Sequence, residues 1–117
     1  MPKSISRTTR RARARVAAPS VPYEPWLIEQ LKDPVEAAGY LEAVLEDGDQ
    51  GAIMVALRQV ALAQGGLARV ARKAHLTREA TYKILSKSGN PELRSLSAIL
   101  KATGLRITFR PIEKPAA

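Results

Sequence analysis

The stretch that decides the fold is LARVARKAHLTREATYKIL, residues 67–85. Its first part predicts a short helix over about 67–74, preceded by two glycines that end an earlier helix. A tight turn follows at His75 and Leu76. Thr77 can then N-cap a second helix that runs to about Leu85. The stretch therefore predicts two short helices joined by a tight turn.

Small and apolar residues in this stretch match two helices that cross closely. Ala71 is small where the second helix must approach the first, and Leu76 follows the turn and is predicted to face the core. Ile84 and Leu85 are predicted to pack the second helix back onto the body, with Val70 completing that contact. This is the helix-turn-helix pattern of DNA-binding domains. The alternative is a plain amphipathic helix hairpin with a solvated basic face.

The outward positions of the second helix are predicted to contact DNA. They are Thr77, Arg78, Glu79, Thr81 or Tyr82, and Lys83, and Arg69 on the first helix completes the set. The N-terminal end of a recognition helix meets base edges, which suits Arg78 for a guanine and Thr77 for a phosphate or a thymine methyl. Tyr82 and Lys83 lie one turn further on, where phosphate contacts are more natural.

Three further helices are predicted around this stretch. Their N-caps are Asp33, with Pro34 in the first turn, then Asp49 and Asn90. Their inward residues are predicted to be Val35, Ala38, Leu41 and Leu45 in the first, Ile53, Leu57, Val60 and Ala61 in the second, and Leu93, Leu96, Ile99 and Leu100 in the third. Together with the pair at 67–85 they make an all-α fold of five helices.

After the last helix the apolar period changes from helical to alternating. Leu105, Ile107 and Phe109 alternate with polar residues, which predicts a half-buried β-strand over 105–110. A single strand cannot satisfy its own backbone, and no second strand pattern occurs in the chain. We therefore expect this strand to pair antiparallel with its copy across a homodimer, with these three residues at the dimer interface.

The domain boundaries follow from these elements. Residues 26–110 are predicted to form one helix-turn-helix domain that includes the strand. Residues 1–25 read as a basic, disordered tail with a proline-rich linker, and residues 111–117 read as a short tail.

Charge is segregated along the chain, whose net charge is +8. Residues 1–23 carry six basic residues and no acid, residues 24–49 carry eight acids and a single lysine, and residues 50–117 carry twelve basic residues and three acids. Such segregation favours one surface that binds a polyanion and an acidic surface with another role. The alternative is a chance distribution of solvated faces.

The sequence contains few residues that would support catalysis or cofactor binding. There is no cysteine and a single histidine, so zinc has no ligand set. The acidic run at 46–49 is no calcium loop, because the twelfth position from Asp47 is Arg58 and not glutamate. The longest apolar run, 52–57, is too short for a membrane span, and the basic N-terminus lacks the apolar region of a secretory signal. We expect a cytoplasmic protein that is not an enzyme and has no cofactor.

A set of short motifs resembles a known family. The motifs are LKDP at 31–34, YLE at 40–42, LEDGD at 45–49, LTREATYKILS at 76–86, GNP at 89–91 and GLR at 104–106. Residues 26–110 thereby resemble the Xre-type addiction-module antidote proteins, the HigA-like antitoxins paired with toxins of the RelE/ParE superfamily. The chain departs from the family pattern at His75, where glycine is usual, and at Thr81, where an apolar residue is usual. The usual glycine implies a left-handed backbone at His75, which histidine tolerates.

The resemblance implies a homodimeric autorepressor that binds a palindromic operator in double-stranded DNA and neutralises a cognate RelE/ParE-like toxin. Family-like DNA contacts fall on Thr77, Arg78, Tyr82 and Lys83. Toxins of that superfamily tend to be basic, so the acidic stretch 24–49 is predicted to bind the toxin. Its predicted partner-binding residues are Trp26, Leu27, Glu36 and Tyr40. Two alternatives remain: a dimeric repressor without a toxin, and a basic protein that associates with RNA or the ribosome.

Overall fold

The computed structural model describes residues 25–113, which contain six helices and no strand. The helices are α1 (Pro25–Gln30), α2 (Pro34–Asp47), α3 (Gln50–Ala63), α4 (Leu67–Ala74), α5 (Arg78–Ile84) and α6 (Leu93–Ala102). The all-α prediction is confirmed, and the predicted count of five was one too few. The additional helix α1 begins at Pro25, at the end of the predicted linker, and continues to Gln30, where no helix was predicted. What we predicted for 1–24 and 114–117 lies outside the described residues.

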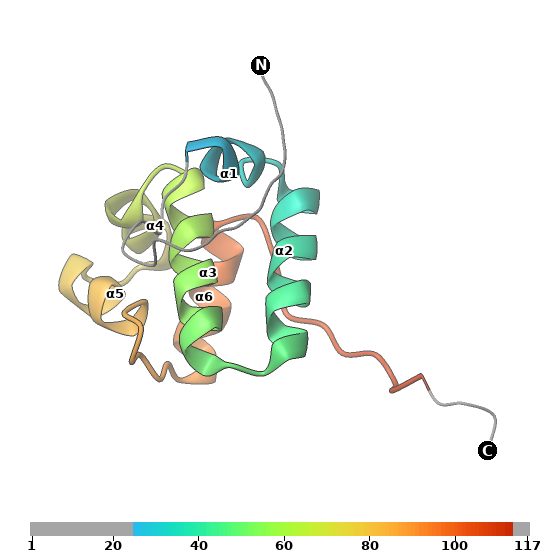
Figure 1. Cartoon of the computed structure of the whole chain (residues 1–117). Helices are drawn as coiled ribbons and strands as arrows, with labels where there is room; N and C mark the ends of the chain where they lie inside the picture. Colours follow the sequence, from blue (N-terminus) through green and yellow to red (C-terminus); the bar gives the residue numbers. More distant parts are fainter. Residues whose placement is uncertain (1–24, 114–117) are drawn as a thin grey trace.

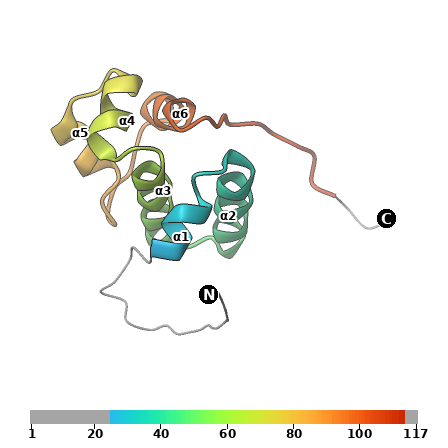
Figure 2. The same ribbon diagram turned by 90° about the horizontal axis from the view of Figure 1, so that it is seen from above.

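Helix α3 stands at the centre of the fold and contributes to both hydrophobic clusters. Figures 1 and 2 show α2 on one side of it and α4 and α5 on the other, with α6 behind it in the view of Figure 1. The larger cluster joins α3, α4 and α6 through buried Met54, Leu57, Ala61, Leu67, Val70, Ala74, Leu85 and Ile99. The smaller one joins α1, α2 and α3 through buried Leu31, Ala37, Val60 and Ala63. Two lobes therefore share a single central helix.

Three of the predicted helix caps are confirmed. Asp33 accepts the backbone N–H of Val35 at 2.9 Å, and Asp49 accepts that of Gly51 at 3.0 Å. At the start of α5, Thr77 Oγ1 accepts the backbone N–H of Ala80 at 3.0 Å.

The predicted cap of α6 is wrong, because Glu92 and not Asn90 stands at its N-cap. Gln50 Nε2 of α3 donates to the backbone carbonyl of Gly89 at 2.9 Å, which holds the preceding loop against α3. Helix α6 therefore begins at Leu93, after this anchored loop and Pro91.

Two predicted apolar stripes contain residues that the fold leaves exposed. Val35 is 76% exposed and Leu45 is also exposed, because α2 buries Ala37 and half-buries Leu41 and Val44 instead. Two stripes that lie side by side on the same helix satisfy the helical period about equally well, and only packing against α3 selects one. Leu93 is exposed because it is the first residue of α6, where a side chain leans back beyond the helix start.

The turn between α4 and α5 has the predicted left-handed residue. His75 adopts φ 61° at the C-cap of α4, and its successor Leu76 donates its backbone N–H to the carbonyl of Ala71 at 2.9 Å. Asn, Asp and His tolerate this backbone better than most side chains other than glycine. A histidine can therefore occupy the turn where the resembling family has glycine.

The segment after α6 is an extended arm. Gly104, with φ 90°, ends the helix, and Leu105 packs against the smaller cluster. The arm then passes α2 and leaves the body, as Figure 1 shows, with Arg110 3.6 Å from the carboxylate of Glu42. Residues 105–110 are not a strand in the single chain, which offers them no pairing partner within the described region.

Candidate nucleic-acid interface

Helix α5 is held to the body by one face and presents the opposite face outward. Leu85 and Thr81 are fully buried, and Ile84 packs against the larger cluster. Val70 of α4, also fully buried, belongs to the same cluster as Leu85. These positions confirm the predicted contact between the two helices. Because Thr81 and Leu85 point inward, the side chains on the opposite side of α5 face out.

Thr81 is buried, which removes it from the predicted outward set. Its Oγ1 donates to the backbone carbonyl of Thr77 at 2.9 Å, so the hydroxyl is satisfied within the helix. A buried polar group costs little when it is hydrogen-bonded. A threonine can therefore stand where the resembling family has an apolar residue.

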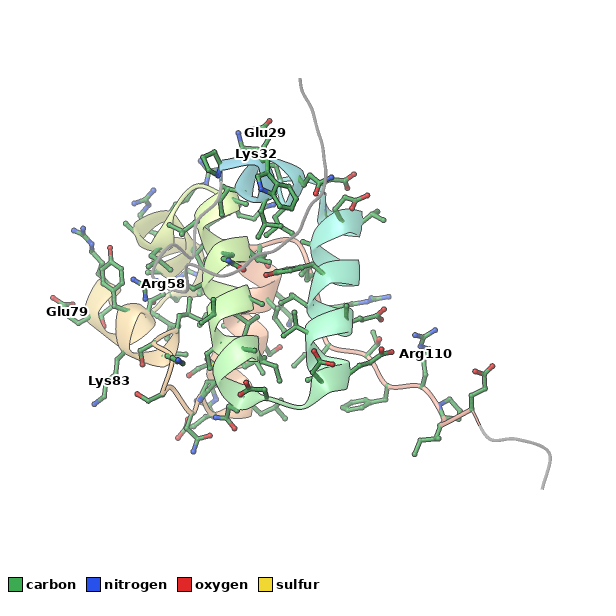
Figure 3. All side chains as sticks on the ribbon, viewed as in Figure 1. Glu29, Lys32, Arg58, Glu79, Lys83 and Arg110 are labelled. Carbon is green, nitrogen blue, oxygen red and sulfur yellow. The ribbon has the colours of Figure 1, made fainter. Side chains whose placement is uncertain are left out.

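The other residues predicted to contact DNA lie on the surface. Thr77, Arg78, Glu79, Tyr82 and Lys83 are exposed on and just before α5, and Arg69 is exposed on α4. Figure 3 shows Glu79 and Lys83 pointing away from the body. Arg78, Glu79 and Tyr82 line a shallow hollow of about 250 Å³. Three of the predicted residues therefore share one surface feature.

Sequence reasoning missed Arg58, which comes from α3. Its Cζ lies 5.6 Å from the ring centroid of Tyr82, and Cζ of Arg78 lies 5.9 Å from the same centroid. Arg58 lies in a mostly apolar stretch of α3, and nothing in the sequence around it indicates a role at the DNA-binding surface. Only the tertiary contact between Arg58 and the ring of Tyr82 reveals its place at this surface.

A second surface feature lies between α1 and α2. It is a groove of about 420 Å³, lined by Leu27, Gln30, Leu31, Val35, Glu36, Gly39 and Tyr40. Three of the four predicted partner-binding residues, Leu27, Glu36 and Tyr40, are thus brought together. Trp26 is exposed on α1 but is not among the lining residues. Val35 and Gly39 were missed as lining residues, the first because it was assigned to the core.

Tyr40 forms part of the structure of this groove. Its hydroxyl donates to Gln59 Oε1 of α3 at 2.5 Å. Burial raises the pKa of the Tyr40 hydroxyl above its ordinary value, so it stays protonated and able to donate at neutral pH. The ring is therefore fixed between α2 and α3.

The helices on the two sides of α3 differ in charge: α2 is mostly acidic, and α4 and α5 are mostly basic. Acidic Asp33, Glu36, Glu42, Glu46 and Asp47 lie on or just before α2, whereas Arg69, Arg72, Lys73, Arg78 and Lys83 lie on α4 and α5. Figure 1 shows α2 and α5 separated by α3. The charge segregation predicted along the chain is therefore also a segregation in space.

The predicted dimerisation residues differ in exposure. Leu105 and Ile107 are half-buried, whereas Phe109 is 89% exposed and Ile112 is similarly exposed. The apolar side of the arm thus continues beyond the part of the body that covers it.

Within residues 25–113, histidine, aspartate and glutamate form no group of three or more that could hold a metal ion. Taken singly, none of the helices has the length and apolar character to cross a bilayer. Taken together, α3 and α4 are long and apolar enough to do so, but they are bent by 92° at the break between them, and this rests on length and composition only.

Comparison with known proteins identifies the family. A family model described as "Probable addiction module antidote protein" matches residues 26–111. A protein of Haemophilus influenzae named "Uncharacterized protein" is 33% identical over 78 residues, which cover 67% of this chain and 79% of that protein. No solved structure matches the chain. Because the family model spans nearly all of the described residues, the chain belongs to the family of probable addiction module antidote proteins.

Proposed function

We propose that this chain is the antitoxin of a type II toxin–antitoxin module. In this proposal it acts by binding and not by catalysis: it represses its own promoter through DNA binding and neutralises a cognate toxin of the RelE/ParE kind by direct contact. Membership of the antidote family supports the antitoxin role. The two oppositely charged surfaces on either side of α3 support a division between DNA and toxin.

DNA binding is assigned to α4 and α5, which form the helix-turn-helix unit of the proposal. The observation that carries this assignment is the orientation of α5, which buries Thr81 and Leu85 and leaves Arg78, Tyr82 and Lys83 exposed. A recognition helix needs this arrangement, because its outward side chains must enter the major groove while its inward ones hold it on the body.

Homodimerisation is assigned to the arm. Leu105, Ile107 and Phe109 alternate with polar residues, and the exposed Phe109 has no apolar cover within the described chain. Pairing of two such arms about a twofold axis supplies the missing strand partner and covers Phe109. A dimer then binds an inverted repeat whose half-sites lie about one helical turn apart.

Toxin binding is assigned to the groove between α1 and α2. Its wall contains apolar Leu27 and Val35 beside acidic Glu36, and Trp26 is exposed nearby on α1. An apolar centre with a charged rim is typical of protein interfaces, in which buried anchors supply affinity and charge selects the partner.

Two binding measurements test the proposal. In the first, fluorescence anisotropy compares a duplex from the promoter of the chain's own gene with a shuffled duplex of equal length. We expect a preference of at least about a thousandfold at physiological salt. In the second, the chain is co-expressed with the product of the neighbouring small gene, and relief of growth arrest is scored. Operator binding without a neighbouring toxin would favour a stand-alone repressor, and equal affinity for both duplexes would favour a basic RNA-associated protein.

A further inference from the structure

The ring of Tyr82 is shared by two arginines from different helices. Arg58 of α3 and Arg78 of α5 place their Cζ atoms 5.6 and 5.9 Å from its centroid. A guanidinium within about 6 Å of an aromatic centroid is attracted by the negative face of the ring. These three residues form what we call the arginine–tyrosine stack, which joins the central helix to the outward face of α5.

The two ends of the stack differ in how firmly their helices are held. Arg58 is flanked by buried Leu57 and Gln59 on a helix of 14 residues that takes part in both hydrophobic clusters. Helix α5 has seven residues, too few to be stable without tertiary contacts. A contact from Arg58 to Tyr82 therefore connects the outward face of α5 to the most firmly packed helix of the fold.

Ordering an arginine side chain before binding has a clear physical benefit. A free arginine loses rotamer freedom when it is fixed against a ligand, and that loss weakens binding. Arg78 lies one helical turn before Tyr82, so the ring restricts its guanidinium in the unbound protein. If Arg58 in turn restricts the ring, both side chains are already ordered when DNA arrives.

We propose that Arg58 is a positioning residue for the DNA-reading face: it holds the ring of Tyr82, and the ring holds Arg78 in the orientation that meets a base edge. This inference rests on the proposed DNA binding of α5. It adds a third element, α3, to a surface that otherwise consists of α4 and α5. The competing role for Arg58 is an ordinary phosphate contact that involves no other side chain.

The first test needs no DNA. In the free protein, the side-chain protons of Arg78 are expected to show an upfield ring-current shift in NMR spectra. Arg58→Met keeps an unbranched stem but removes the guanidinium, and it should reduce that shift toward the value in Tyr82→Leu. Lys101→Met, an exposed change at the far end of α6, should leave the shift as in the wild type. An unchanged Arg78 signal in Arg58→Met would overturn the proposal.

The second test measures DNA binding in a double-mutant cycle. Arg58→Met should lower affinity for the promoter duplex about two- to fivefold, the size expected of an exposed cation–π contact. It should change affinity for shuffled DNA less, and it should cause no additional loss in the Tyr82→Leu background. Tyr82→Phe keeps the ring and should retain the effect of Arg58.

The contrary outcome is equally distinct. Independent losses that multiply in the double variant, together with equal weakening on promoter and shuffled DNA, would make Arg58 a phosphate contact and refute the positioning role. A wild type that does not prefer its promoter would instead refute the proposed function. The NMR measurement needs no DNA and would still test the arginine–tyrosine stack. Failure of the positioning role and failure of the proposed function are therefore distinguishable. Circular dichroism on every variant confirms that each one is folded.

Discussion

The α1–α2 lobe and the α4–α5 unit are built on the same central helix but differ in how their surfaces arise. In the α4–α5 unit, a continuous stretch of sequence supplies the buried residues and the exposed ones together. In the α1–α2 lobe, the groove forms between two helices, and residues such as Val35 that look like core line it instead. The exposed face of one helix can therefore be predicted from the local sequence, whereas a groove depends on how two helices pack.

The largest expected effect tests whether the arm holds two DNA-binding units together. Ile107→Pro removes a backbone donor and a half-buried side chain from the arm, so it should prevent strand pairing. Loss of the second DNA-binding unit should lower affinity for the promoter by about 10²- to 10⁴-fold, the usual gain from bivalency. Light scattering should show a dimer for the wild type and a monomer for the variant. A monomeric wild type at micromolar concentration contradicts the prediction.

A core substitution tests how strongly the α4–α5 unit is attached. Leu85→Ala removes a fully buried side chain from the larger cluster and should cost about 2–5 kcal/mol of unfolding free energy. Leu45→Ala is the matched control, because Leu45 is exposed on α2 and its loss should stay within about 0.5 kcal/mol. Urea denaturation measures both. Equal losses would mean that α5 is not fixed by this contact.

The DNA surface should respond differently to its two kinds of cation. Arg78→Ala should weaken promoter binding by about 1–3 kcal/mol and relax base preference, because it removes a base contact. Lys83→Ala should weaken all DNA alike and reduce the slope of log affinity against log salt by about one. Fluorescence anisotropy at several salt concentrations separates them. Both variants should neutralise the toxin as the wild type does, and reduced neutralisation would argue against two separate surfaces.

The smallest effect concerns the groove. A side chain at Gly39 would meet no atom within 4 Å at its Cβ, so Gly39→Met should fold normally and fill the groove beside Val35. We expect about tenfold weaker toxin binding, or ~1.4 kcal/mol, with promoter binding unchanged. Gly39→Ala, which fills less space, should have an intermediate effect by titration calorimetry. A fully retained toxin affinity in Gly39→Met would place the toxin elsewhere.

Local signals in the sequence predicted much of this fold correctly. Asp33, Asp49 and Thr77 were identified as caps because a short side-chain acceptor before an apolar period acts on neighbouring backbone groups. The left-handed backbone at His75 was expected from the glycine that the resembling family has at this position, and His75 has φ 61°. The outward residues of α5, Thr81 apart, were also predicted, because the buried positions of a short helix leave few alternatives.

The errors have two causes: contacts with other helices that the sequence does not reveal, and one local pattern that was misread. Thr81 is buried because its hydroxyl bonds back within the helix while its remaining surface faces the core. Val35 and Leu45 are exposed because α2 packs against α3 along a neighbouring stripe. Helix α1 was missed because Pro25 was assigned to the linker and the first helix was predicted to begin at Asp33, although a proline in the first turn of a helix is well tolerated.

Sequence alone determined where α2, α3 and α5 begin, which stretch carries positive charge and which side of α5 faces out, because these depend on residues within a few positions of one another. Tertiary structure alone decided that Arg58 of α3 reaches Tyr82 of α5, and that Leu27 and Tyr40 line one groove. The partners in these contacts are separated by 13 to 24 residues, and no period in the sequence encodes such a distance. They exist because helices pack at angles set by the shapes of their buried side chains.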